Sequence, residues 1–183
     1  MNNILVTGEV QIGKSTVIDK VLDMLKQEYS LNIGGYRGIR NTIKEGDNIR
    51  FSFDIKPIKD NSLYRILEHK TIDGKNDVKI YSESFEEYSV KLKEDLENCD
   101  LIILDEIGFA EKNSPKYLGV LKEVLDSDKI VFGALKKKNC SVVNSVAARD
   151  DVTLFTVDKD NRDYIYNDIW KILDGLITQN SDI

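Results

Sequence analysis

The feature that most constrains this chain is a glycine-rich segment near its start, GEVQIGKST, which spans residues 8–16. It fits the phosphate-loop pattern G-x-x-x-x-G-K-[ST], in which glycines let backbone N–H groups approach phosphate oxygens closely. The apolar run NILVT precedes it, and Val17, Val21, Leu22 and Leu25 follow it with the spacing of a half-buried helix. Strand, loop and helix arrive in the order that the motif requires, so we predict a nucleotide site.

Two residues of this loop have distinct expected roles. Lys14 would reach the β- and γ-phosphates, and the Ser15 hydroxyl would ligate Mg²⁺. Glu9 is unusual where a phosphate approaches, but the variable positions contribute backbone amides, and their side chains can point outward. The structural alternative is a glycine turn capped by Ser15, with Lys14 in solvent.

A second apolar run, LIIL, ends in the acids Asp105 and Glu106. A phosphate loop needs an acid at the end of a neighbouring strand. We therefore expect Asp105 to hold Mg²⁺ through water and Glu106 to take a proton from an attacking water. The alternative is that both acids merely terminate the strand or cap the next segment of the chain.

The rest of the chain alternates between predicted strands and helices. Apolar residues that alternate with polar ones predict an antiparallel hairpin over 33–56, and the polar segment 60–76 is expected to be a loop. Further strands are expected at DVKIY, KIVFGAL and VTLFTV, and helices over 85–98 after Ser84, 116–125, 141–149 and 165–176. We predict one three-layer α/β/α domain over 1–177, with a mostly parallel sheet and an antiparallel hairpin addition, and a frayed tail over 178–183.

Composition narrows the classes of function. The chain has 183 residues, enough for one ordinary domain, and its net charge of −6 gives no electrostatic footprint for nucleic acid or anionic membrane. No apolar stretch approaches the roughly 20 residues that span a bilayer, and the first strand leaves no room for a signal peptide. His69 is the single histidine, and Cys99 and Cys140 lie far apart, which argues against zinc and disulfide frameworks. We expect a cytoplasmic protein, with the lysine run 136–138 in a solvated loop.

Several blocks in the right order resemble the THEP1-type nucleoside-triphosphatases, also called cancer-related nucleoside-triphosphatases. They are GEVQIGKST, GGYRGIR, FEEYSVKLKEDLENCDLIILDEIG, VLKEVLDSDKIVFGAL and VTLFTVDKDNRD, and they cover most of the chain. The resemblance implies a P-loop fold and hydrolysis of ATP, GTP and other nucleoside triphosphates to diphosphate and phosphate, with Mg²⁺ and broad base tolerance. The chain departs from the family where Phe109-Ala110-Glu111 stands in place of the usual Lys-Met-Glu.

The resemblance also implies that the loop and the segment 101–108 together form the nucleotide site. The catalytic residues would be Glu106 and Lys14, and Ser15 and Asp105 would hold the metal. The expected nucleotide-binding residues are Gly8, Glu9, Val10, Gln11, Ile12, Gly13, Lys14, Ser15, Thr16, Asp105, Glu106, Ile107 and Gly108.

Charge on the γ-phosphoryl group in the transition state would benefit from an arginine. Arg40, Arg149 and Arg162 are the candidates, although each could instead form a surface ion pair. Asn161 is expected to cap the last helix. The segment DKDN departs from the guanine-specific Asn-Lys-x-Asp pattern at its last position, so we expect no preference for GTP.

Two other functions remain open on the same scaffold. A small nucleotide or nucleoside kinase would need a second pocket and a lid, for which the segment 60–76 with Arg65 is the candidate. A slow nucleotide-binding switch or accessory protein could use the hairpin over 33–56 as its partner surface. The sequence leaves the protein partners, oligomeric state and physiological substrate undetermined.

Overall fold

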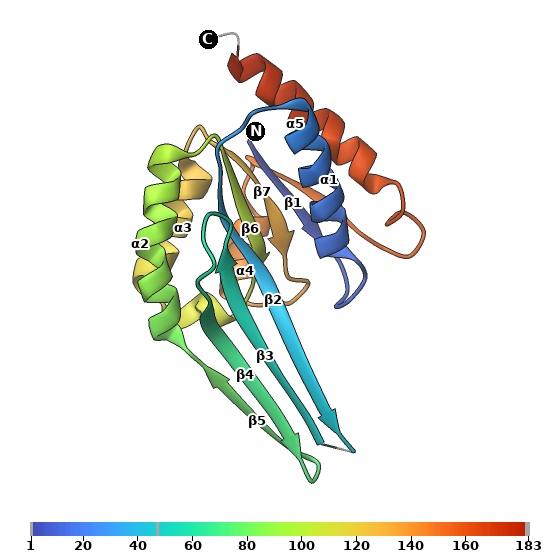
Figure 1. Cartoon of the computed structure of the whole chain (residues 1–183), viewed down its shortest axis with the longest axis vertical. Coiled ribbons are helices and arrows are strands. Elements are labelled where there is room, and N and C mark those ends of the chain that lie inside the picture. The colour runs from blue at the N-terminus through green and yellow to red at the C-terminus, as the bar shows by residue number, and fades with distance from the viewer. Residues whose placement is uncertain (1, 47, 182–183) are drawn as a thin grey trace.

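The structure is a computed structural model that describes residues 2–46 and 48–181. One eight-stranded sheet has the order β5-β4-β3-β2-β6-β7-β1-β8, and helices cover both of its faces (Figure 1). The strands are β1 Asn3–Thr7, β2 Ile33–Glu45, β3 Asn48–Pro57, β4 Tyr64–Ile72, β5 Lys75–Ile80, β6 Leu101–Ile107, β7 Ile130–Leu135 and β8 Val152–Thr156. The helices are α1 Lys14–Glu28, α2 Ser82–Asn98, α3 Pro115–Asp126, α4 Ser141–Ala147 and α5 Ile165–Ser181, with a 3-10 turn over Ala110–Asn113. The predicted α/β fold class is confirmed.

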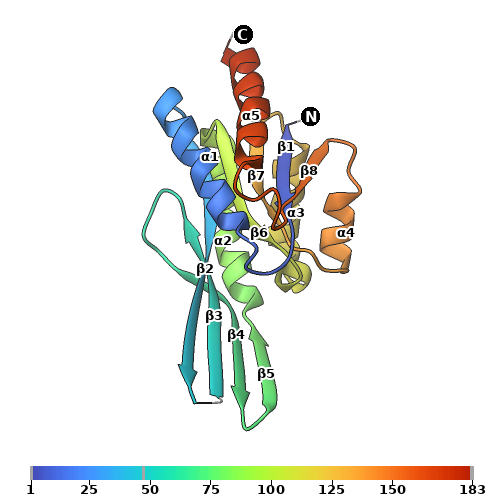
Figure 2. The same cartoon turned by 90° about the vertical axis from the view of Figure 1, so that its right-hand side faces the viewer.

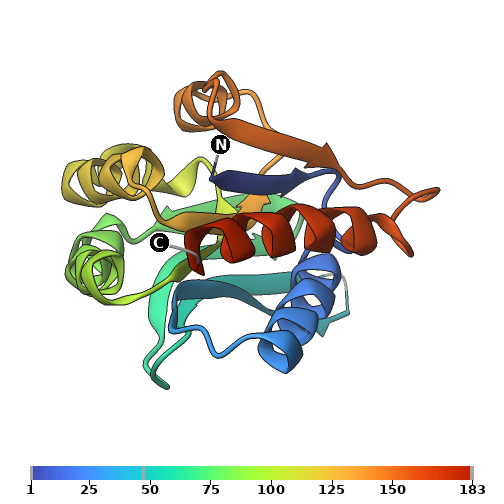
Figure 3. The same ribbon diagram turned by 90° about the horizontal axis from the view of Figure 1, so that it is seen from above.

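The strands β2, β6, β7, β1 and β8 form the parallel half of the sheet. Successive side chains of β6 point to opposite faces, so its continuous apolar run supplies both cores. Ile102 and Leu104 pack with α2 and α3, whereas Leu101 and Ile103 pack with α1 and α5. The helices α1 and α5 lie side by side on their face (Figure 3).

The strands β2, β3, β4 and β5 form an antiparallel extension of this sheet. β2 pairs with β6 only as far as Arg37, and beyond that residue it continues as the partner of β3. Figure 2 shows the four strands projecting together from the parallel half. The predicted hairpin over 33–56 is confirmed, and its tip at residue 47 lies outside the described residues.

The prediction of a loop over 60–76 is wrong, because β4 and the start of β5 occupy this segment. Its polar residues suggested a loop, but they lie on a strand that pairs with β3, and some of them bond polar residues of the sheet. Arg65 of β4 bonds Asp54 of β3 and Glu68 of its own strand. The segment is therefore part of the extension, and Arg65 is not on a lid.

Three predicted helix boundaries also need correction. α2 begins at Ser82 rather than after Ser84. α5 continues to Ser181 rather than fraying from Thr178, whose hydroxyl donates to the Asp174 carbonyl at 2.8 Å. Residues 182 and 183 of the predicted tail lie outside the described residues. Asn161 does not cap α5, because its Oδ1 accepts from the backbone N–H of Asp158 at 3.0 Å, ahead of the helix.

Within residues 2–46 and 48–181, none of the helices is both long enough and apolar enough to cross a bilayer.

Candidate functional site

The loop between β1 and α1 has a backbone that its two motif glycines make possible. Gly13 precedes α1 with a φ of 115°, which side chains disfavour. A Cβ at Gly8 would lie 2.4 Å from the carbonyl oxygen of Val157, which follows β8. α1 begins immediately after Gly13, so its free N–H groups and the positive end of its dipole lie at the loop. This is the local structure that binds anions in other proteins.

Lys14 lies over the loop and is nearly buried. Its Nζ donates to the carbonyl oxygens of Gly8 and Glu9, each at 3.1 Å, and lies 3.2 Å from Glu106 Oε1. Only 9% of the Lys14 side chain is exposed. The alternative with Lys14 in solvent is therefore wrong.

The acids Asp105 and Glu106 lie near the carboxyl end of β6, just before its last residue, Ile107. Asp105 pairs with Ala134 of β7 and Ile107 with Leu135, so Glu106 is the extra residue of a β-bulge. Bulges re-aim side chains beside functional sites. Glu106 lies between two cations, Lys14 at 3.2 Å and Lys136 at 3.5 Å.

Arg37 is a residue of this site that the sequence analysis missed. It pairs in register with Asp105 across β2 and β6, and its Nε lies 2.9 Å from Asp105 Oδ2. The same guanidinium donates to the Ser15 carbonyl at 3.2 Å and to Asp19 of α1. Burial raises the pKa of Asp105, and the Arg37 charge opposes that rise. Arg37 thus ties the loop helix to the acid-bearing strand.

The residues at this point fit a magnesium ion. Mg²⁺ binds hard oxygen ligands, and proteins hold it through one or two carboxylates, with substrate phosphates and waters completing the shell. Ser15 and Asp105 supply a hydroxyl and a carboxylate beside the loop, and Arg37 engages only one carboxylate oxygen, Oδ2. Among the described residues, no cluster of three or more His, Cys, Asp or Glu side chains could hold a metal ion by itself.

A cavity of about 590 Å³ lies over the loop and the two acids. Most of the predicted nucleotide-binding residues line it, namely Val10, Gln11, Gly13, Lys14, Ser15, Thr16, Asp105 and Glu106.

Five other predicted residues do not line this cavity, and their contacts explain why. Ile107 is fully buried in the core, and the Gly108 N–H donates to Glu111 Oε1 at 2.8 Å. The carboxylate of Glu9 points away to Lys137 at 2.7 Å, and that contact lowers the pKa of Glu9. The backbone carbonyl of Gly8 accepts from Lys14. The side chain of Ile12 packs against the core cluster that includes the apolar face of α1.

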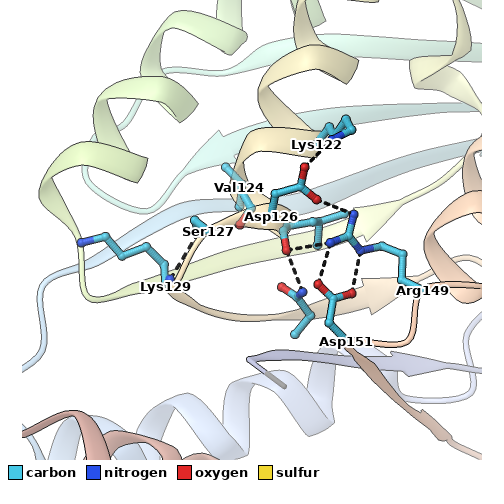
Figure 4. A network of polar contacts seen from close by, with 9 residues as sticks. Lys122, Val124, Asp126, Ser127, Lys129, Arg149 and Asp151 are labelled. Atoms are coloured by element: carbon cyan, nitrogen blue, oxygen red, sulfur yellow. Dashed lines mark hydrogen bonds and ion pairs between the residues drawn. The ribbon is translucent and has the colours of Figure 1, made fainter.

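The three candidate arginines lie in different places. Arg40 lines the cavity from β2, whereas Arg162 is exposed in the turn after β8 and outside the lining. Arg149 does not line the cavity and instead forms the ion pairs given as its alternative, with Asp126 at 2.8 Å and Asp151 at 2.6 Å (Figure 4). It also donates to the carbonyl of Leu125 in the last turn of α3, and its partner Asp151 directly precedes β8, so it lies at the opposite end of the parallel strands from the phosphate loop.

The lysine run after β7 lies in a loop where Lys137 and Lys138 are exposed, as predicted, but Lys136 also contributes to the site. Lys136 lines the cavity, and its Nζ lies 5.2 Å from the ring centroid of Phe109. Lys137 pairs with Glu9, and Lys138 lies 3.7 Å from the Phe109 ring. One available signal was the position of the run, since ligands bind beyond the carboxyl ends of parallel strands.

Glu111 is a buried carboxyl beside the site. It is 2% exposed, and Oε2 has no hydrogen-bond partner among the described residues. Burial raises its pKa from 4.5 to about 7, against the opposing effect of the Gly108 N–H. The folded protein therefore holds a proton on Glu111 that the unfolded chain releases at lower pH.

We expect this carboxyl to make stability depend on pH. Because the pKa of Glu111 is higher in the folded state, the protonated carboxyl contributes fully to the free energy of unfolding below about pH 4.5. That contribution, roughly 3 kcal/mol, is lost as pH rises through about 7. Glu111→Gln keeps the shape of the side chain and cannot ionise. Urea unfolding of both proteins across this range should show wild type losing stability relative to Glu111→Gln as pH rises. A difference that stays constant with pH would contradict the assignment.

The sequence is similar to proteins of one known family. A family model described as NTPase matches residues 3–170. The nucleoside-triphosphatase THEP1 of Thermotoga maritima is 32% identical over 174 residues, which cover 93% of this chain and 94% of that protein. The nucleoside-triphosphatase THEP1 of Methanocaldococcus jannaschii is 33% identical over 178 residues, which cover 94% and 98%.

A solved structure also resembles this chain. The crystal structure of THEP1 from the hyperthermophile Aquifex aeolicus superposes with a TM-score of 0.69 at 20% identity, covering 94% of this chain and 99% of that one. This likeness concerns the fold.

Proposed function

The chain belongs to the THEP1-type family of nucleoside-triphosphatases, and on that basis we propose that it hydrolyses the terminal phosphate of nucleoside triphosphates with Mg²⁺. The reaction converts a nucleoside triphosphate and water to the diphosphate and phosphate. The observation that carries the proposal is the contact between Lys14 Nζ and Glu106 Oε1, at 3.2 Å. It places the cation of the phosphate loop beside the acid of β6. Asp105 precedes Glu106 on β6 and lines the same cavity as Lys14 and Glu106.

The loop would bind and orient the phosphate chain. Phosphate oxygens offer Lys14 better partners than the carbonyls of Gly8 and Glu9, because both partners are then charged. The N-terminus of α1 adds backbone donors that are already in place before the reaction. Preorganised donors of this kind stabilise charge that develops in the transition state.

Ser15 and Asp105 would hold the metal ion. When bound, Mg²⁺ would neutralise charge on the β- and γ-phosphate oxygens. Arg37 keeps the Asp105 carboxylate in place, because it bonds that side chain and the Ser15 backbone at once. Arg37 is therefore a positioning residue.

Glu106 would accept the proton of the attacking water. Its side chain is 19% exposed, so a water can reach it, and the bulge directs it toward the loop. Lys136 contacts the other oxygen of this carboxylate and would lie near the charge of the γ-phosphoryl group. We propose Lys136 for that charge, with Arg40 as a further cation that lines the cavity.

The kinase alternative loses the support that the predicted lid gave it. Arg65 and its segment belong to the sheet extension and are held by Asp54 and Glu68. The structure offers no matching reason to favour a slow switch. Hydrolysis therefore remains the function that the site supports best.

The proposal is tested by phosphate release from ATP, GTP, CTP and UTP, each with Mg²⁺ and without an acceptor. We expect release from all four at similar rates and loss of release when EDTA removes the metal. Release that persists in EDTA would contradict the metal assignment. No release from any of the four would overturn the proposal.

A further inference from the structure

The cavity has a second half that the phosphates would not fill. Its lining here is the aromatic wall, defined as Arg40 of β2, Phe51 and Phe53 of β3, His69 of β4 and Val78 of β5. We propose that the aromatic wall binds the planar ring of a second molecule, of the nucleoside class, beside the terminal phosphate of the first. This inference rests on the proposed function, because that function places the terminal phosphate.

Strand register makes the aromatic wall one continuous surface. Arg40 pairs with Phe53, Phe51 pairs with His69, and His69 pairs with Val78. Cross-strand partners share a face of the sheet, and so do residues two apart on one strand. All five side chains therefore project from the same face of the extension seen in Figure 2.

The side chains of the wall are already arranged for stacking. The guanidinium of Arg40 lies 4.4 Å from the ring centroid of Phe51, and the rings of Phe51 and His69 stack at 4.6 Å with 19° between their planes. Arg40 is exposed, and Val78 is 50% exposed, so the layer is open to a ligand. Nucleobases stack on aromatic rings and on arginine planes.

The aromatic wall directly adjoins the acids of the site. Lys136 Nζ lies 3.5 Å from Glu106 Oε2 and 5.3 Å from the centroid of Phe53. Gly38 lies between wall and acids, and a Cβ there would come within 2.7 Å of the Asp105 carbonyl oxygen. Under the proposed function, Glu106 would mark the side from which water attacks, opposite the leaving diphosphate. A ring on the wall would therefore lie beyond the terminal phosphate, away from the nucleotide's own base.

Charge and size favour a small ligand over a polynucleotide. Nucleic-acid binding draws on many lysine and arginine contacts to phosphates, whereas this chain carries a net charge of −6. The cavity, at about 590 Å³, lies within the range of small-molecule sites. A nucleoside supplies the stacking ring without the phosphate charges of a polynucleotide.

The test is calorimetric titration of adenosine, guanosine, cytidine or uridine into protein saturated with Mg²⁺ and a non-hydrolysable triphosphate. We expect one nucleoside to bind per loaded chain. Phe51→Ala should weaken that binding about tenfold, since the variant removes the ring against which Arg40 and His69 stack. Phe51→Leu keeps the apolar packing and should lose affinity similarly. Tyr164→Ala, which removes an exposed ring outside the cavity, is the matched control and should bind as wild type does.

Four outcomes would overturn the inference. They are no saturable binding, displacement of the nucleoside by the triphosphate analogue, unchanged affinity in both Phe51 variants, and tighter, salt-dependent binding of a single-stranded oligonucleotide. Failure of the analogue to load would overturn the proposed function and this inference with it. If the protein hydrolyses triphosphates but binds no nucleoside, only this inference fails. If the loaded protein binds a nucleoside but the protein hydrolyses no triphosphate, only the hydrolase proposal fails.

Discussion

Glu106→Gln is expected to lower kcat about 10²–10⁴-fold, because the amide cannot accept the proton of the attacking water. The carboxylate lies within 3.2 Å of Lys14 and 3.5 Å of Lys136, so both lysines would remain near the phosphates in the variant. Removing a negative charge beside a polyanion should leave nucleotide binding equal or tighter. Single-turnover phosphate release and calorimetric binding of a non-hydrolysable triphosphate measure the two effects separately.

The matched control for this variant is Glu123→Gln. Glu123 lies on α3, where it pairs with Lys93 of α2 at the surface, and its substitution should leave kcat unchanged. A kcat for Glu106→Gln within a few-fold of wild type would show that another group accepts the proton.

Lys14→Ala is expected to lower kcat/KM at least about 10²–10³-fold, since it removes a charged donor aimed at the transferred phosphate. Unlike Glu106→Gln, it should also weaken binding of a non-hydrolysable triphosphate, because Lys14 contacts the phosphates before the reaction as well as during it. Steady-state phosphate release and calorimetric binding measure these losses.

Lys14→Ala also removes contacts to the Gly8 and Glu9 carbonyls, so its Tm should be measured alongside its activity. Lys20→Ala is a control from the same helix, where Lys20 lies 4.5 Å from the Tyr166 ring. That control should keep wild-type activity. Wild-type nucleotide affinity in a folded Lys14→Ala protein would contradict the assignment of the loop.

The parts of the site that the sequence predicted are those encoded by local patterns. The loop glycines, Lys14 and Ser15 form one contiguous motif whose backbone needs those residue types. Asp105 and Glu106 were recognisable because an apolar strand ends in them. Gly13, Lys14, Ser15, Asp105 and Glu106 line one cavity because parallel strands deliver their carboxyl ends to the same edge of the sheet.

The parts that the sequence could not predict depend on pairing between distant segments. Arg37 reaches Asp105 only because β2 lies beside β6 in one particular register. The aromatic wall likewise depends on the registers of β3, β4 and β5. The segment of β4 was predicted as a loop because it is polar, and the sequence does not show that its polar residues find partners on β3. The sequence could not separate Arg149 from the site, because a charged residue near a predicted strand does not reveal which end of the sheet it occupies.

The most direct test of the account is a crystal structure of the protein with Mg²⁺ and a non-hydrolysable triphosphate. We predict that Lys14 Nζ leaves the carbonyls of Gly8 and Glu9 for β- and γ-phosphate oxygens, with the metal between Ser15 and Asp105. A triphosphate bound elsewhere, with Lys14 still on its carbonyl partners, would contradict the central claim that this loop and the acids of β6 form the catalytic site.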